Sequence, residues 1–169
     1  CYVDSRKDYW RIFPYIEHTR NISLIENPEQ ARQASRAFGT YIRQLADLDP
    51  GVLQETIDHF HDYRKRIETL EQSIREDQED RVIRCRQEIG EVDRRLSYIE
   101  SFYEIDLPTR IVHSDAKIDN VLFEENSDMA RAVIDLDISM PASLLYDYGD
   151  MIRSYTSTVR EDDDRFDRI

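Results

Sequence analysis

Apolar residues recur at helical spacing after Asn27, and this pattern predicts the first long helix. Asn27 is a suitable N-cap residue, Pro28 suits the first helical position, and Gln30 falls at the capping-box position. A turn signal follows at residues 49–51. The buried face of this helix is expected to consist of Ala31, Ala34, Phe38, Tyr41, Ile42 and Leu45.

A second periodic stretch runs from about residue 62 to residue 103 and is rich in charge. Its apolar positions are spaced alternately three and four residues apart, which predicts a long helix packed on its own domain and leaves a coiled-coil seam as the alternative. Cys85 falls in this stripe as a small core residue. The stripe consists of Val82, Cys85, Ile89, Val92, Leu96, Ile99 and Tyr103.

Short apolar runs predict strands on both sides of a polar loop. Residues 110–112 form one strand, and residues 121–123 and 132–134 form a hairpin across a polar turn. Residues 10–17 also suit a strand, which Pro14 restricts to an edge or an irregular position. A last helix is predicted over residues 143–155, with an apolar face of Leu144, Leu145, Tyr148, Met151 and Ile152. The fold class is therefore α+β, mainly α, with long helices and a small β-hairpin.

Composition and charge narrow the possible classes of function. The chain has 169 residues and a formal net charge of −13, which argues against a nucleic-acid-binding surface. No apolar run approaches the roughly 20 residues that span a bilayer. The two cysteines do not make a disulfide framework. We expect a soluble, cytoplasmic protein that binds neither nucleic acid nor membrane.

The polar loop between the predicted strands carries the residue types that phosphoryl transfer requires. Asp115 is placed to accept or orient the proton of a substrate hydroxyl. Asn120 and Asp135 offer hard oxygen ligands for magnesium, and Lys117 offers a positive charge to the transferring phosphoryl group. His113 is expected to anchor the loop. The alternative is a hairpin whose polar loop only caps strand ends.

The sequence of this loop, His113-Ser114-Asp115 with Asn120 five residues after the aspartate and Ile134-Asp135 at the next strand end, resembles the aminoglycoside phosphotransferase family. That family is a branch of the protein-kinase-like fold that also holds choline and homoserine kinases. It usually has glycine where Ser114 stands. Residues 133–137, 140–141 and 146–153, together with 10–17 and 55–62, are similar to N-acetylhexosamine 1-kinase-like members.

The resemblance implies a role for several further residues. Asp147 would be a buried carboxylate that braces the catalytic loop, and Asp137 would be a further member of the metal or substrate shell. The backbone of Tyr15, Ile16 and Glu17 would face the adenine. The implied cofactors are ATP and Mg²⁺, and the implied acceptor is a hydroxyl of a small molecule. An N-acetylhexosamine is preferred, with choline, an aminoglycoside or homoserine as alternatives.

The resemblance also suggests how the domains are organised. The chain has no glycine-rich phosphate loop and no strand lysine paired with a helix glutamate. Residues 1–20 are therefore expected to be a hinge strand and linker to a missing N-terminal lobe. Residues 21–169 are expected to be the C-terminal lobe, truncated at its end. We expect such a chain to be inactive alone and to self-associate through its uncovered surface.

A different class of function remains open, and some charged residues have simpler explanations. The stripe of the second helix could make the chain a non-catalytic helical interaction module, although such a module has no need of the complete loop chemistry. His59 and His61 are expected to be surface or packing histidines, since only two nitrogens are on offer for a metal. The acidic run Glu161–Asp164 is expected to be a solvated tail.

Overall fold

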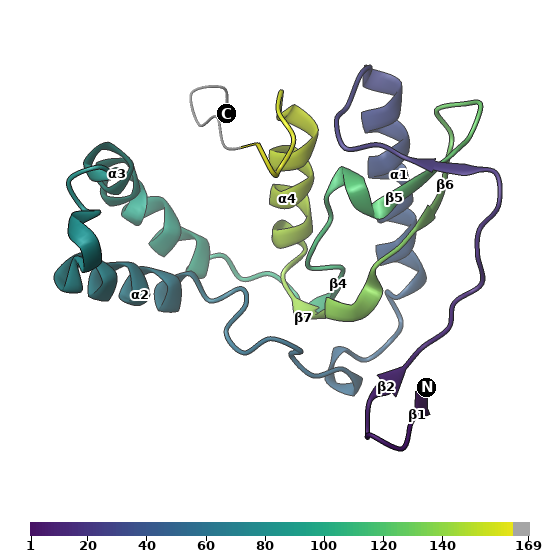
Figure 1. The fold of residues 1–169 in the computed structure, drawn as a ribbon, viewed down its shortest axis with the longest axis horizontal. Coiled ribbons are helices and arrows are strands. Elements are labelled where there is room, and N and C mark those ends of the chain that lie inside the picture. Colours follow the sequence, from purple (N-terminus) through teal and green to yellow (C-terminus); the bar gives the residue numbers. More distant parts are fainter. Residues whose placement is uncertain (164–169) are drawn as a thin grey trace.

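A computed structural model describes residues 1–163 as a mixed α/β fold with small antiparallel sheets (Figure 1). The helices are α1 (Pro28–Gln44), α2 (Tyr63–Glu76), α3 (Arg86–Tyr103) and α4 (Leu144–Thr156). Short 3₁₀ helices are η1 (Pro50–Val52), η2 (Gln78–Asp80), η3 (Ile118–Asn120) and η4 (Leu136–Ile138). The strands are β1 (Tyr2–Val3), β2 (Tyr9–Trp10), β3 (Thr19–Asn21), β4 (Arg110–Val112), β5 (Val121–Glu124), β6 (Ala130–Val133) and β7 (Met140–Ala142).

The hydrophobic core lies between α1 and the antiparallel sheet β3-β5-β6 (Figure 1). Strands β5 and β6 form the predicted hairpin, with Val121 opposite Val133. Phe38 of α1, Ile118 of η3 and Phe123 of β5 are fully buried. Each such side chain contributes roughly 1.5–3 kcal/mol on leaving water. The core therefore places the predicted catalytic loop directly on the sheet.

The N-terminus of α1 is capped as the sequence predicts, with one difference. The side chain of Asn27 accepts hydrogen bonds from the backbone N–H groups of Glu29 and Gln30. The Gln30 side chain does not return to Asn27. Instead, its Oε1 accepts from the backbone N–H of Glu26, and its Nε2 donates to Asp128 in the β5–β6 turn. The cap thus also fastens α1 to the hairpin.

The predicted long helix over residues 62–103 is wrong, because the chain breaks between α2 and α3. Asp77, Glu79 and Asp80 take positive φ values of 38°, 62° and 53°, which a continuous α-helix does not accommodate. Neither α2 nor α3 contains a fully buried residue, and Cys85 is exposed at the start of α3 rather than in a core. The stripe within α3 therefore begins only at Ile89.

The two helices α2 and α3 lie together to one side of the sheet and meet the rest of the fold through aromatic residues (Figure 1). The Tyr103 hydroxyl accepts a hydrogen bond from the backbone N–H of Tyr63. Tyr146 of α4 donates its hydroxyl to the carbonyl of His61 and stacks on the His61 ring at 4.0 Å. His59 forms a surface ion pair with Asp62. Both histidines thus have the surface and packing roles that the sequence predicts.

The strand predicted over residues 10–17 is also wrong in most of its length. Only Tyr9–Trp10 pairs, with Tyr2–Val3. Pro14 lies in an irregular segment that leads to β3, where the side chain of Ile12 is 97% exposed.

The last helix is confirmed, with Ser143 as its N-cap, but Tyr148 and Ile152 lie on its exposed side. None of the helices in the described part of the chain is long and apolar enough to cross a membrane.

Candidate active site

His113 anchors the loop that joins β4 to η3. Its Nε2 donates a hydrogen bond of 2.8 Å to the carbonyl oxygen of Ile134, just after β6. Its Nδ1 accepts from the backbone N–H of Asp115 at 3.3 Å. This pair of bonds corresponds to the neutral imidazole with its proton on Nε2. Phe38 of α1 packs edge-on against the ring at 5.2 Å, so the imidazole is fixed on several sides.

Asp147 of α4 lies completely buried beneath the same loop. Its two carboxylate oxygens accept hydrogen bonds of 2.8 Å from the backbone N–H groups of His113 and Ser114. Burial raises the pKa of the Asp147 carboxyl, and the two N–H donors oppose that rise. These two bonds fix the direction in which the loop leaves β4.

Ser114 occupies a backbone conformation that favours glycine. Its φ is 71°, in the left-handed region that costs a residue with a Cβ roughly 1–2 kcal/mol. Its hydroxyl oxygen is buried and has no hydrogen-bond partner within residues 1–163. This backbone conformation is a reason for the glycine that the resembled family usually has at this position. Serine is tolerated here at a cost in stability.

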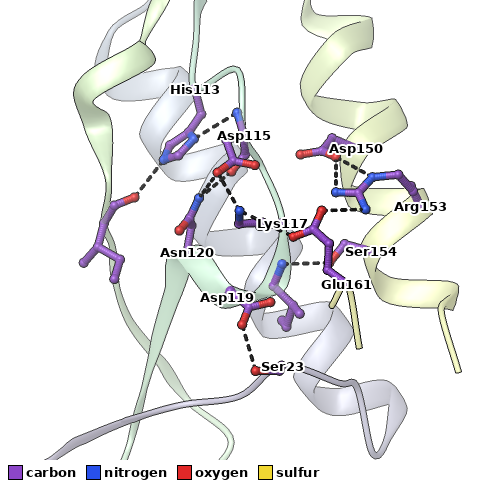
Figure 2. Close-up of polar contacts among 12 residues, drawn as sticks. Ser23, His113, Asp115, Lys117, Asp119, Asn120, Asp150, Arg153, Ser154 and Glu161 are labelled. Carbon is purple, nitrogen blue, oxygen red and sulfur yellow. Dashed lines mark hydrogen bonds and ion pairs between the residues drawn. The ribbon is translucent and has the colours of Figure 1, made fainter. Parts of the chain in front are cut away.

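Asn120 and Lys117 both contact the carboxylate of Asp115 (Figure 2). The Asn120 amide nitrogen donates to Asp115 Oδ2 and to the Asp115 carbonyl oxygen, each at 2.8 Å. Lys117 Nζ lies 3.0 Å from the same Oδ2. Within the described residues, nothing bonds to Asp115 Oδ1 or to Asn120 Oδ1. The arrangement thus leaves one carboxylate oxygen for a substrate hydroxyl and one amide oxygen for a cation.

The Lys117 ammonium is kept charged by its neighbours. Partial burial lowers its pKa, but the hydrogen bond and charge of Asp115, together with Glu161, outweigh burial, and the net pKa is raised. The site therefore holds a permanent positive charge beside the carboxylate of Asp115.

Asp135 follows β6, directly after a residue whose backbone bonds to Asn120. The N–H of Ile134 donates to the carbonyl of Asn120 at 3.0 Å, and Asp135 itself has φ 62° and ψ 55°. Its side chain is exposed. An amide oxygen and a carboxylate are the hard oxygen donors that Mg²⁺ takes, usually with phosphate and water as its other ligands. No group of three or more His, Cys, Asp or Glu side chains in residues 1–163 could hold a metal.

The other predicted residues lie outside the loop. Asp137 of η4 pairs with Arg11 at 2.5 Å, which ties the segment before β3 to the segment after Asp135. On that N-terminal segment, Tyr15 is exposed and Ile16 is half-buried. The carbonyl oxygen of Ile16 accepts a hydrogen bond from the hydroxyl of Thr19.

Several residues that hold the loop were not predicted from the sequence. Ser154 Oγ accepts from the backbone N–H of Ile118 at 2.9 Å. Ser154 lies seven residues after Asp147, two helical turns along the same face of α4, and that spacing is the signal that could have identified it. Ser23 Oγ donates to Asp119 at 2.8 Å. Helix α4 and the start of the chain therefore hold the loop from opposite sides.

The model of the phosphotransferase enzyme family matches residues 2–168. The chain belongs to this family. Membership of this family suggests ATP-dependent transfer of a phosphoryl group to small-molecule acceptors. This activity gives the Asp115 loop its chemical context. The predicted resemblance to aminoglycoside phosphotransferase and choline kinase-like proteins is confirmed at the level of the family, and so is a kinase-type enzyme.

Proposed function

We propose that this phosphotransferase transfers the γ-phosphate of Mg·ATP to a sugar hydroxyl, with an N-acetylhexosamine as the preferred acceptor. The observation that carries the proposal is the set of contacts around Asp115. Asn120 and Lys117 fix one of its oxygens, and the other is left for a hydroxyl proton. The likeness of residues 133–137, 140–141 and 146–153 to N-acetylhexosamine 1-kinase-like sequences supports the choice of acceptor.

Each residue of the loop then has one task. Asp115 Oδ1 accepts or orients the proton of the acceptor hydroxyl. Asn120 Oδ1 and the carboxylate of Asp135 would hold the cation, which when bound neutralises phosphate charge. Lys117 places a further positive charge beside the transferring group. His113 and Asp147 act only by holding the backbone, so the rate would come mainly from positioning and charge.

The remainder of the chain would serve this site. In the proposed organisation, residues 21–169 form the C-terminal lobe, of which residues 164–169 lie outside the described residues. Tyr15, Ile16 and Glu17 would face the adenine from the segment before β3, and Asp137 would join the metal or substrate shell on release from Arg11.

The test is phosphoryl transfer from Mg·ATP to a panel of N-acetylhexosamines, choline, an aminoglycoside and homoserine. It is run on this chain and on any longer form of the protein, because the chain has no glycine-rich phosphate loop of its own. Asp115→Asn is the inactivating variant. Asp93→Asn, on the exposed side of α3, is its matched control.

We expect turnover with an N-acetylhexosamine only in the longer form, its loss there by about 10²–10⁴-fold in Asp115→Asn, and no change in Asp93→Asn. Turnover with a different acceptor would rule out the sugar as the substrate and would retain the assignment as a kinase. Equal rates for Asp115→Asn and the unmodified protein would refute the assignment of Asp115.

A further inference from the structure

A series of alternating opposite charges leads from Asp115 through Lys117, Glu161 and Arg153 to Asp150 of α4 (Figure 2). Lys117 Nζ lies 3.0 Å from Asp115 and 3.5 Å from Glu161 Oε2. The other oxygen of Glu161 is 3.0 Å from Arg153, which in turn donates two hydrogen-bonded contacts of 2.8 and 2.9 Å to Asp150. Glu161, expected from the sequence to be part of a solvated tail, is therefore a neighbour of the catalytic loop.

The ion pair between Lys117 and Asp115 differs from an ordinary surface ion pair. Exposed pairs contribute little, because water screens them and long side chains must be ordered to form them. The side chains of Lys117 and Asp115 are only 26% and 22% exposed, whereas helix-surface pairs such as Lys65–Glu68 are 54% and 66% exposed. The ammonium of Lys117 is thus held in a partly desolvated place, where the loss of a charged neighbour changes its position.

Glu161 reaches this place because the chain turns back after α4. Ser157 ends the helix in an extended conformation, and a turn closes where the N–H of Asp163 bonds to the carbonyl of Arg160. Arg153 lies on α4 next to Ser154, whose hydroxyl holds the backbone of Ile118. The helix therefore fixes the loop backbone directly and the Lys117 side chain through Glu161.

We propose that Glu161 is a positioning residue for phosphoryl transfer, which together with Asp115 fixes the place of the Lys117 ammonium. This inference rests on the proposed kinase function. Two carboxylates share one ammonium, so its place is set by two contacts, 3.0 Å to Asp115 and 3.5 Å to Glu161. Without Glu161, Lys117 would be held by Asp115 alone, and its less restrained side chain would no longer keep the positive charge beside the phosphoryl group.

The decisive variant is Glu161→Gln, which keeps the shape and removes the charge. Its matched control is Asp162→Asn, since Asp162 is the next residue, is exposed, and pairs only with Arg160 among the described residues. We expect Glu161→Gln to lower kcat by about 10-fold with little change in the KM for the acceptor. In a Lys117→Met background, Glu161→Gln should have no further effect on kcat, because the ammonium that Glu161 contacts is no longer present.

A second readout needs no turnover at all. Lys117 is one of three lysines, with Lys7 and Lys65 as internal references. A limiting dose of an amine-acetylating reagent followed by peptide mass spectrometry measures how freely each amine reacts. We expect several-fold faster acetylation of Lys117 in Glu161→Gln, relative to the two references, and no change in Asp162→Asn, because a carboxylate beside an amine keeps it protonated and shielded.

The two readouts separate the possible failures. Unchanged acetylation of Lys117 in Glu161→Gln overturns the positioning role, whatever the kinetics. Faster acetylation with unchanged kcat shows that the contact exists and has no part in the reaction, which also overturns the proposal. Faster acetylation with no turnover by any form of the protein on any acceptor overturns the proposed function, and with it the catalytic part of the inference.

Discussion

The buried carboxylate of Asp147 accepts a hydrogen bond of 2.8 Å from the backbone N–H of Ser114, whose φ is 71°. The bond joins α4 to the residue of the β4–η3 loop that has a positive φ. The loop's conformation is therefore fixed from below by a helix that contributes nothing to the proposed chemistry itself.

Replacing Asp147 by asparagine should destabilise the protein. The amide has one oxygen for two backbone donors, so the N–H of His113 or of Ser114 would face an NH₂ group in a buried place. We expect a loss of about 1–3 kcal/mol in the free energy of unfolding, measured by urea denaturation. Asp93→Asn on the surface of α3 should leave it unchanged. An Asp147→Asn protein of full stability would contradict the assigned contacts.

Ser114→Gly should stabilise the protein. Glycine removes the strain of a positive φ and a buried hydroxyl without a partner, and these gains exceed its larger entropy in the unfolded chain. We expect a net gain of about 1 kcal/mol, again from urea denaturation. The opposite sign is expected for Ser97→Gly in the middle of α3, where glycine only weakens a helix.

The Asp128 carboxylate should give stability a component that depends on pH. Gln30 and Asn27 donate to it, Arg20 adds a further hydrogen bond and charge, and together they hold the pKa of Asp128 below its usual value. This contribution is fully present above the carboxyl pKa of the unfolded chain, about 3.9, and is lost as pH falls through the lower native pKa.

Asp128→Asn should therefore lower the melting temperature at pH 7 and make less difference as the pH approaches 3. Melting curves between pH 7 and pH 3 for both proteins test this expectation. A difference in melting temperature that stays constant over the whole range would show that the charge of Asp128 is unimportant.

The attachment of α2 and α3 should be the least stable part of the described structure. Neither helix contains a fully buried residue, and Tyr146 joins them to α4 by donating its hydroxyl to His61. Tyr146→Phe keeps the ring stack and removes about 1 kcal/mol of local stabilisation. Hydrogen exchange should become faster in α2 and stay unchanged in α1. Tyr98→Phe, exposed on α3, should have no effect, and uniform changes in both helices would argue against a local attachment.

Local signals in the sequence were sufficient for much of this fold. The Asn27 cap predicted the start of α1, and the apolar runs around a polar turn predicted the β5–β6 hairpin, because both depend on neighbouring residues. No glycine or proline in the sequence marks the break between α2 and α3. Its positive φ values fall on Asp77, Glu79 and Asp80. A periodic stripe alone could not reveal it.

The candidate site, like the fold, could be predicted from the sequence only in part. The sequence predicted the residue types of the loop from their spacing, and the resemblance to the family implied the bracing role of Asp147. It could not predict that Glu161 reaches Lys117, since that contact depends on a chain reversal after α4. It also could not predict Arg11 against Asp137, which are distant in the sequence. Contacts of this kind depend on tertiary structure and leave no local pattern.

The two bonds to Oδ2 of Asp115 have a stereochemical consequence. With Asn120 and Lys117 on that oxygen, an acceptor can approach only the Oδ1 side of the carboxylate. A sugar presents several hydroxyls of similar acidity, and they differ chiefly in the direction from which each can reach a fixed point. On the proposed mechanism, the regiochemistry of phosphorylation is therefore set by which hydroxyl the bound ring turns toward one oxygen atom, and a chemically stronger nucleophile elsewhere on the ring would gain nothing.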